Sequence, residues 1–337
     1  NAELRLARAN AWLSGARQFL QGAGTVVFTW VAADLALNNH LTLGALFAVL
    51  AYQQTASGRL VMLVERLLSI RMLSVHLERL ADIVYAEPQA NDHSGAPLAD
   101  DEAVSITLEN VHFRFSPSEP EILRGVSLTI KAGEHVALTG ASGCGKTTLM
   151  KLMLGILEPT EGAILYNGKP MADFGLAQQR AITAAVLQDD ALFYGTIKDN
   201  ISYFDPEASD DKVAHAATLA CIAPDIAAMP MNYLGLVGEG SGMLSGGQRQ
   251  RLLLARAIYR APKVLMLDEA TSHLDGQNEA RVNAGIKSLG VTRVSIAHRP
   301  DSLLAAERIV IMHAGVVAQE FTPEQFMRVL QGQPPGE

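Results

Sequence analysis

A glycine-rich segment followed by a lysine and two threonines offers the clearest chemistry in the sequence. It consists of Gly140, Ala141, Ser142, Gly143, Cys144, Gly145, Lys146, Thr147 and Thr148. The glycines let the backbone bend close to phosphate oxygens, and the N–H groups of the loop and of a following helix favour an anion. Lys146 can then reach the β and γ phosphates, and Thr147 can offer its hydroxyl to Mg²⁺. The segment predicts a site that binds ATP.

Two neighbouring carboxylates close an apolar run later in the chain. Val264–Leu267 is apolar, and Asp268 and Glu269 follow it directly. A buried parallel strand delivers acids to the edge of a sheet in this way. We expect Asp268 to help hold Mg²⁺ through water and Glu269 to polarise the attacking water. Alone, the pattern would be a strand with a polar end, but after a phosphate loop it indicates hydrolysis.

A second potential anion site lies at Ser245–Gln248. Ser245 is a favourable N-cap residue, and Gly246 and Gly247 stand at the start of a helix whose apolar spacing continues through Tyr259. Glycines beside a free helix N-terminus can bind phosphate. An ordinary capped helix is the alternative. One chain has no obvious use for a second phosphate site, whereas a dimer would.

The elements expected around these segments are those of an α/β domain. Residues 104–115 alternate in the manner of a strand, and 126–130 and 135–138 are expected to form further strands. The last of these leads into the phosphate loop, and a stretch of helical period follows Thr148. A loop of this composition between a strand and a helix is the context that supports nucleotide binding.

Length and composition limit the possible functions. The 337 residues suffice for two domains, and a start at Asn1 suggests a piece of a longer protein. The composition, 49% apolar and 18% charged, suits a membrane segment joined to a soluble domain. A net charge of −8 disfavours a nucleic-acid partner. Cys144 and Cys221 are far apart and are expected to be reduced thiols in the cytosol.

The first third of the chain is predicted to be a membrane hairpin. Residues 18–33 and 41–58 are uncharged, and with their apolar flanks each approaches the ~20 residues that cross a bilayer. A turn is expected at Asn38–His40. The turn has no Lys or Arg, but arginines precede the first stretch and follow the second, which places both ends in the cytoplasm. A soluble hairpin that packs on a core is the alternative.

The second helix is expected to continue into the cytoplasm. Apolar residues recur at helical spacing, so that Leu41–Tyr85 would form a rod of roughly 65 Å. Residues 1–86 would thus form the helical part and 87–103, rich in Pro, Ala and Asp, a linker.

These segments together resemble the ATP-binding domain of ABC transporters, over residues 104–330, with 331–337 as a tail. Leu244–Gln248 is similar to the ABC signature, which other phosphate-loop enzymes lack. The resemblance assigns Gln188 to the Q-loop that contacts Mg²⁺ and water, and His298 to the switch histidine at the γ-phosphate. It also assigns Phe115 to the aromatic that stacks on adenine and Asp275 to the D-loop. Leu236–Gly240 resembles the loop that touches the membrane helices of exporters. Each residue alone could be structural, but their joint order favours these roles.

The resemblance also implies a fold and an assembly. The fold would be an α/β phosphate-loop domain with an antiparallel β subdomain and a helical subdomain, preceded by an all-α transmembrane hairpin with a long cytoplasmic extension. ATP would lie between two copies of the chain in a homodimer, where Ser245 and Gly247 donate to the γ-phosphate in trans. Glu269, His298 and Lys146 would be catalytic, and Thr147, Gln188 and Asp268 would hold Mg²⁺.

The cargo is suggested by two further likenesses. Arg71–Asp82 resembles the helix before the ATPase in bacteriocin exporters of the colicin V type, which carry a cysteine peptidase that trims a double-glycine leader. His273 in the D-loop is similar to the branch that exports peptides and proteins. The expectation is a multi-pass exporter of the bacterial inner membrane, in contact with lipid, that moves a peptide. The alternatives are an exporter of lipids or drugs and a soluble ABC ATPase.

Overall fold

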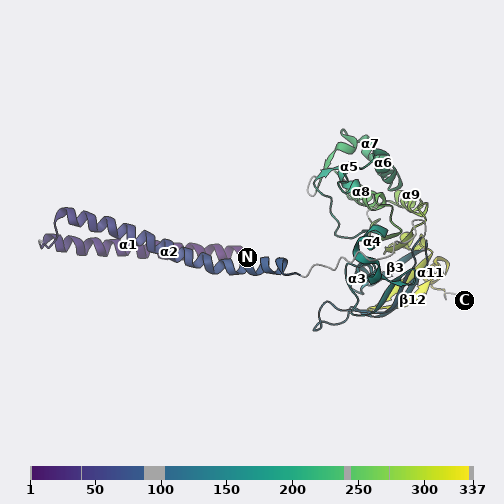
Figure 1. The fold of residues 1–337 in the computed structure, drawn as a ribbon, viewed down its shortest axis with the longest axis horizontal. Helices are drawn as coiled ribbons and strands as arrows, with labels where there is room; N and C mark the ends of the chain where they lie inside the picture. The colour runs from purple at the N-terminus through teal and green to yellow at the C-terminus, as the bar shows by residue number, and fades with distance from the viewer. Residues whose placement is uncertain (1, 39, 87–102, 239–243, 273, 334–337) are drawn as a thin grey trace. The chain divides into compact units, whose positions relative to one another are not determined.

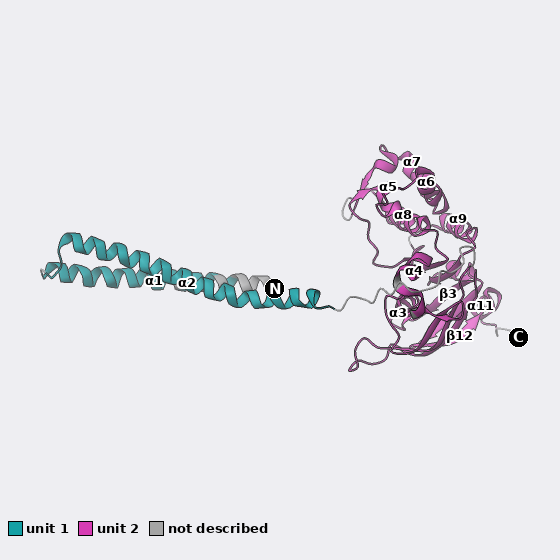
Figure 2. Ribbon diagram, viewed as in Figure 1, with its two compact units in different colours: residues 1–89 teal, residues 90–337 magenta. Residues whose placement is uncertain are grey.

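The computed structural model describes residues 2–38, 40–86, 103–238, 244–272 and 274–333. They fall into two compact units, residues 1–89 and 90–337 (Figures 1 and 2). The predicted linker at 87–102, residues 239 and 240 of the loop before the signature, and His273 lie outside the described residues.

The first unit is a hairpin of two helices that lie side by side (Figure 1). Helix α1 spans Ala2–Leu37 and α2 spans Leu43–Val84. The Thr42 hydroxyl accepts a hydrogen bond from the Ala45 amide at 3.2 Å and so caps α2. With 42 residues, α2 is roughly 63 Å long at 1.5 Å per residue. The predicted continuous second helix is therefore confirmed, whereas Asn39 of the predicted turn lies outside the described residues.

The hairpin leaves large apolar side chains exposed within its own unit. Trp12, Trp30 and Leu63 are all more than half exposed, and α2 contains no buried residue. Residues 14–37 are long and apolar enough to cross a membrane by length and composition. Among the described residues no other helix meets that test, so the predicted second span at 41–58 has weaker support than the first.

The second unit is an α/β domain with two main sheets (Figure 2). The larger sheet has the order β12-β11-β3-β10-β9-β6, with β12 antiparallel at one edge and the other five strands parallel. Its strands are β3 His135–Gly140, β6 Thr183–Val186, β9 Val264–Asp268, β10 Thr292–Ile296, β11 Arg308–His313 and β12 Val316–Phe321. All residues of β9 are buried, as expected for a strand covered on both faces.

The smaller main sheet is antiparallel, with the order β2-β1-β4-β5. Its strands are β1 Ile106–Phe113, β2 Leu123–Ile130, β4 Glu161–Tyr166 and β5 Lys169–Pro170. Strand β2 begins three residues earlier than the alternation predicts, because the glycine at 125 has a φ of +79° and interrupts the pattern. Strand β1 ends at Phe113, so Phe115 lies beyond it. A two-stranded ribbon of β7 Gly195–Thr196 and β8 Leu236–Val237 completes the strands.

The helices of this unit divide into two groups. Helices α5–α8 gather at one end of the unit (Figure 1), and α6 and α8 pack in an apolar cluster that also includes residues of β6, β9 and α9. The other helices accompany the sheets. Their bounds are α3 Lys146–Met153, α4 Gly175–Ile182, α5 Ile197–Ser202, α6 Asp210–Leu219, α7 Ala223–Ala228, α8 Gly246–Tyr259, α9 Gly276–Lys287, α10 Pro300–Leu304 and α11 Pro323–Leu330, with short 3₁₀ turns at Met171–Phe174 and Asn232–Leu234. The antiparallel and helical parts expected of the fold are both present.

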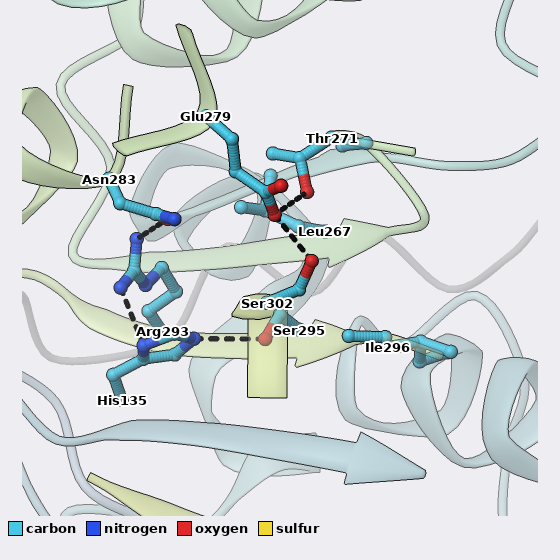
Figure 3. Close-up of a pocket in the computed structure, with 11 residues that line it drawn as sticks. His135, Leu267, Thr271, Glu279, Asn283, Arg293, Ser295, Ile296 and Ser302 are labelled. Carbon is cyan, nitrogen blue, oxygen red and sulfur yellow. Dashed lines mark hydrogen bonds between the residues drawn. The ribbon is translucent and has the colours of Figure 1, made fainter. Parts of the chain in front are cut away.

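A buried histidine lies at the start of β3 (Figure 3). His135 Nε2 is 2.9 Å from Ser295 Oγ, and Nδ1 is 2.5 Å from an Arg293 guanidinium nitrogen. The Ala305 carbonyl oxygen also lies 3.1 Å from Nδ1, so both ring nitrogens have polar partners inside the domain. Burial, together with the charge of Arg293, lowers the pKa of His135 to about 3.

This histidine makes the folded domain sensitive to acid. Its folded pKa is below the usual 6.5, so the unfolded chain binds the proton more tightly and stability is lost as the pH falls through 6.5 toward 3. We expect His135 to contribute a slope approaching about 1.4 kcal/mol per pH unit in this range. Urea unfolding followed by circular dichroism between pH 5 and 7 measures it. His135→Asn will flatten the slope, whereas His215→Asn on the exposed face of α6 will not; equal slopes for both variants would contradict the expectation.

Candidate nucleotide-binding site

The phosphate loop connects β3 to α3 and is shaped by close packing. Gly140 has a φ of +143°, and a Cβ atom there would lie 2.1 Å from the Met312 carbonyl oxygen. Gly145 has a φ of +102°, and its Cβ would lie 2.7 Å from a Leu123 methyl carbon. Both positions therefore require glycine, because the loop is pressed against β11 and β2. Cys144 is buried, with its sulfur directed into the domain core.

Two side chains at the start of α3 tie the loop to its surroundings. Lys146 is 7% exposed, and its ammonium donates to the carbonyls of Gly140 at 2.9 Å and Ala141 at 3.0 Å. The Thr147 hydroxyl donates to Asp268 Oδ2 at 2.8 Å. The cation is thus held at the loop, and the hydroxyl joins the loop to the end of β9.

Asp268 and Glu269 are adjacent in sequence but differ in burial and in backbone conformation. Asp268 is almost fully buried, and burial raises the pKa of its carboxyl while the hydrogen bond from Thr147 opposes the shift. Glu269 is more exposed and has a φ of +52°, a left-handed conformation that is strained for a residue with a side chain. Its amide donates to the Ile296 carbonyl at 3.2 Å, and its Oε1 is 3.4 Å from His298 Nε2. The left-handed backbone places the carboxylate beside the histidine at the edge of the sheet.

Most of the predicted residues meet in one open pocket of ≈ 320 Å³. It is lined by Ser142, Gly143, Gly145, Lys146, Thr147, Thr148, Gln188, Asp268, Glu269 and His298. Ile122 and Ile296 also line it, and sequence reasoning missed them. An isoleucine carries no chemical signal, and only its position next to β2 or at the end of β10 could have indicated a role.

Other predicted residues do not line this pocket. Gly140, Ala141 and Cys144 belong to the loop but not to the lining, and the carbonyls of Gly140 and Ala141 accept from Lys146. Phe115 is 62% exposed and packs edge-on against Phe113, with ring centroids 5.0 Å apart. The Asp275 carboxylate accepts from the Asn278 amide at 2.8 Å and caps α9.

The predicted second anion site is at the exposed start of α8. The Ser245 hydroxyl accepts from the Gln248 amide at 3.2 Å, and the Gln248 side chain accepts from the Ser245 amide at 3.0 Å, which forms a capping box. Ser245, Gly247 and Gln248 do not line the phosphate-loop pocket. Gly246 lines a neighbouring cleft of ≈ 510 Å³ that also contains Gln188 and Glu269.

A phosphate loop between a parallel strand and a helix, with two acids at the end of a strand in the same sheet, defines a phosphate-loop nucleotide hydrolase. The family model described as ABC transporter matches residues 123–272, so this part of the chain is similar to an ABC-type ATPase domain. The match includes the phosphate loop, the signature and both acids.

Relatives of known name extend the likeness to the hairpin. The chain is 38% identical over 310 residues to a probable microcin secretion/processing ATP-binding protein of Escherichia coli, and 37% identical to the colicin V secretion/processing ATP-binding protein of the same organism. Each alignment covers 92% of this chain but 44% of the relative, so the chain spans less than half of their length. A solved bacterial Atm1-family ABC exporter with ATP bound matches with a TM-score of 0.69 and 30% identity, over 96% of this chain and 58% of that one.

The geometry at Glu269 predicts the effect of removing its charge. Glu269→Gln keeps the size of the side chain but loses the group that can accept a proton from water, so ATP turnover should fall about 100-fold or more while ATP still binds. Phosphate release and binding of a fluorescent ATP analogue measure the two effects. Glu324→Gln, an exposed carboxylate in the first turn of α11, is the control and should leave turnover unchanged. Turnover at the wild-type rate in Glu269→Gln would exclude Glu269 as the base.

Proposed function

We propose that this chain is the ATP-hydrolysing part of a bacterial ABC exporter that couples ATP turnover to the export of a peptide across the inner membrane. The observation that carries the proposal is the convergence of Lys146, Thr147, Glu269 and His298 on one pocket, while the signature at Ser245 lies outside it. The printed names of the microcin and colicin V relatives support a secreted peptide as cargo.

The residues around Thr147 fit a magnesium ion. The pocket offers the Thr147 hydroxyl, the Asp268 carboxylate and the Gln188 side chain. Hard oxygen ligands of this kind, few in number, suit an ion that keeps waters and phosphate oxygens as its other ligands. Among the described residues no group of three or more His, Cys, Asp and Glu could form a complete protein cage. When bound, Mg²⁺ would neutralise charge on the β and γ phosphates.

Each remaining residue of the pocket has a distinct part in hydrolysis. Lys146 would exchange the loop carbonyls for phosphate oxygens, since its ammonium already lies at the loop. Glu269 would polarise the attacking water, and His298, 3.4 Å away, would contact the γ-phosphate. Phe115 packs edge-on on Phe113, so a face of its ring remains for an adenine.

The position of the signature supports a two-copy site. The start of α8 is exposed and carries the positive end of a helix dipole, which favours an anion. Because Ser245 and Gly247 do not line the phosphate-loop pocket of their own chain, a second copy would have to supply them. Asp275, at the start of α9, would lie in the same interface.

Mixing two inactive variants tests this arrangement. Lys146→Ala removes the phosphate-loop cation, and Ser245→Arg blocks the helix start, so each variant alone should lack turnover. A mixed dimer has one site built from two intact halves, so an equal mixture should regain about a quarter of wild-type turnover. Ser209→Arg, at the exposed N-cap of α6, is the matched control and should stay active. If the mixture of Lys146→Ala and Ser245→Arg stays inactive although mixed dimers form, the trans assignment fails.

The hairpin supports the membrane part of the proposal. Residues 14–37 meet the length and composition of a span, and the exposed apolar side chains of α2 would face lipid or the remaining helices of the exporter. An exporter of lipids or drugs would have the same engine. A soluble ABC ATPase is disfavoured by residues 14–37 and by the exporter structure that matches 96% of the chain.

Cargo class can be tested with the full-length parent protein in proteoliposomes. A bacteriocin-type peptide with a double-glycine leader should raise ATP turnover about twofold or more, because an exporter closes more often when cargo is bound. A cationic dye and a fluorescent phospholipid serve as probes for the alternatives. Stimulation and transport of the dye or phospholipid without any response to the peptide would replace the peptide proposal.

A further inference from the structure

A buried carboxylate connects the two loops that carry Glu269 and His298. Glu279 lies in the first turn of α9 and is 3% exposed. Its Oε1 accepts hydrogen bonds from the hydroxyls of Thr271, at 3.0 Å, and of Ser302 (Figure 3). Thr271 is two residues after Glu269 in the loop beyond β9, whereas Ser302 belongs to α10, which follows His298 beyond β10. One oxygen therefore binds both loops.

The second oxygen of Glu279 faces Arg299, the residue next to His298. Glu279 Oε2 is 3.5 Å from the Arg299 guanidinium and accepts no hydrogen bond from the described residues. The same guanidinium nitrogen donates to the Leu274 carbonyl at 2.9 Å. A cavity of ≈ 20 Å³ adjoins the carboxylate, enough for about one water molecule. Arg299 is thus shared between the loop after β9 and Glu279.

Stability alone does not explain this carboxylate. A buried carboxylate loses its hydration, and an incompletely satisfied one is a weak source of stability compared with an apolar side chain of the same size. The loop after β9 is bound to the end of β10 by a 3.2 Å hydrogen bond from the Glu269 amide to the Ile296 carbonyl, a long hydrogen bond at a residue in a strained conformation. A strained residue persists only when its surroundings hold it.

We propose that Glu279 is a positioning residue for hydrolysis, which holds the loops after β9 and β10 together and so sets the separation of Glu269 and His298. Its carboxylate contacts Thr271, Ser302 and Arg299, and it would act through them. The inference rests on the roles proposed for Glu269 and His298. We call the contacts of Glu279 with Thr271, Ser302 and Arg299 the Glu279 clamp. Since a displacement of about 1 Å in a catalytic group can lower a rate 100-fold, loosening this clamp should reduce turnover more than ATP binding.

Kinetics of the full chain test the clamp. Glu279→Ala removes the acceptor for both hydroxyls and should lower kcat about 30-fold while the KM for ATP changes less than about threefold. Glu279→Gln keeps an oxygen for the hydroxyls and should restore most of the loss. Thr271→Val preserves the shape of the side chain and removes one hydrogen bond, so it should lower kcat about threefold. It is the second variant for this test if Glu279→Ala does not fold.

Hydrogen exchange gives a readout that is independent of activity. In Glu279→Ala and Thr271→Val, amides of residues 269–272 and 297–303 should exchange about fivefold faster, whereas residues 308–312 of β11 should not change. Glu134→Gln is the matched control, because Glu134 is a largely buried carboxylate that binds Arg308 at 2.8 Å away from the pocket. It should leave kcat and both loops unchanged.

The outcomes distinguish a failure of the role proposed for Glu279 from a failure of the role proposed for Glu269. If Glu279→Ala folds, a wild-type kcat or unchanged exchange in the two loops would overturn the clamp. If Glu279→Ala does not fold, a Thr271→Val chain with wild-type kcat and wild-type exchange would overturn it. Equal losses in Glu279→Ala and Glu134→Gln would show a general effect on stability and would also overturn it. Wild-type turnover in Glu269→Gln would instead refute Glu269 as the proposed base. The clamp would then be tested by hydrogen exchange alone.

Discussion

Parallel pairing of β6, β9, β10 and β3 is the constraint on which the position of every residue in the proposed catalytic site depends. Parallel strands bring their carboxyl ends to one edge of a sheet, and in this domain those ends lead to Gln188, Asp268 with Glu269, His298 and the phosphate loop. The hydrogen bond between Thr147 and Asp268 joins two of these ends directly. Strand register therefore brings these residues to one edge of the sheet, and contacts of the loops that follow the strands set their final separation.

Sequence motifs predicted which residues line the pocket better than they predicted the backbone conformation and buried contacts that position those residues. Lys146, Asp268 and His298 were found where expected, since a strand end or a loop motif is enough to place them. The left-handed backbone of Glu269 and the burial of Glu279 were not predictable, because both arise from packing between elements distant in sequence. A glutamate in the first turn of a helix is usually a solvated partner of the helix dipole, so the pattern at Glu279 carried no signal.

The two units depend on burial to different degrees. In the ATPase unit, β9 and most of α8 are covered by other elements, and even charged groups such as Arg256 are buried with partners: its guanidinium donates to the Asn200 side chain and to the Ala191 carbonyl. In the hairpin, apolar side chains such as Phe47 and Leu63 remain exposed within the unit. The hairpin therefore needs a further apolar environment, whereas the ATPase unit contains its own core.

The uninterrupted length of α2 has a mechanical consequence. The helix contains no proline, and 42 residues share one continuous hydrogen-bond ladder from Leu43 to Val84. A helix of this kind bends little, so a tilt of about 5° about one end would displace the other by roughly 5 Å over its length. Small rotations at either end are thus converted into displacements on the scale of one helical turn, and α2 has the properties of a lever arm.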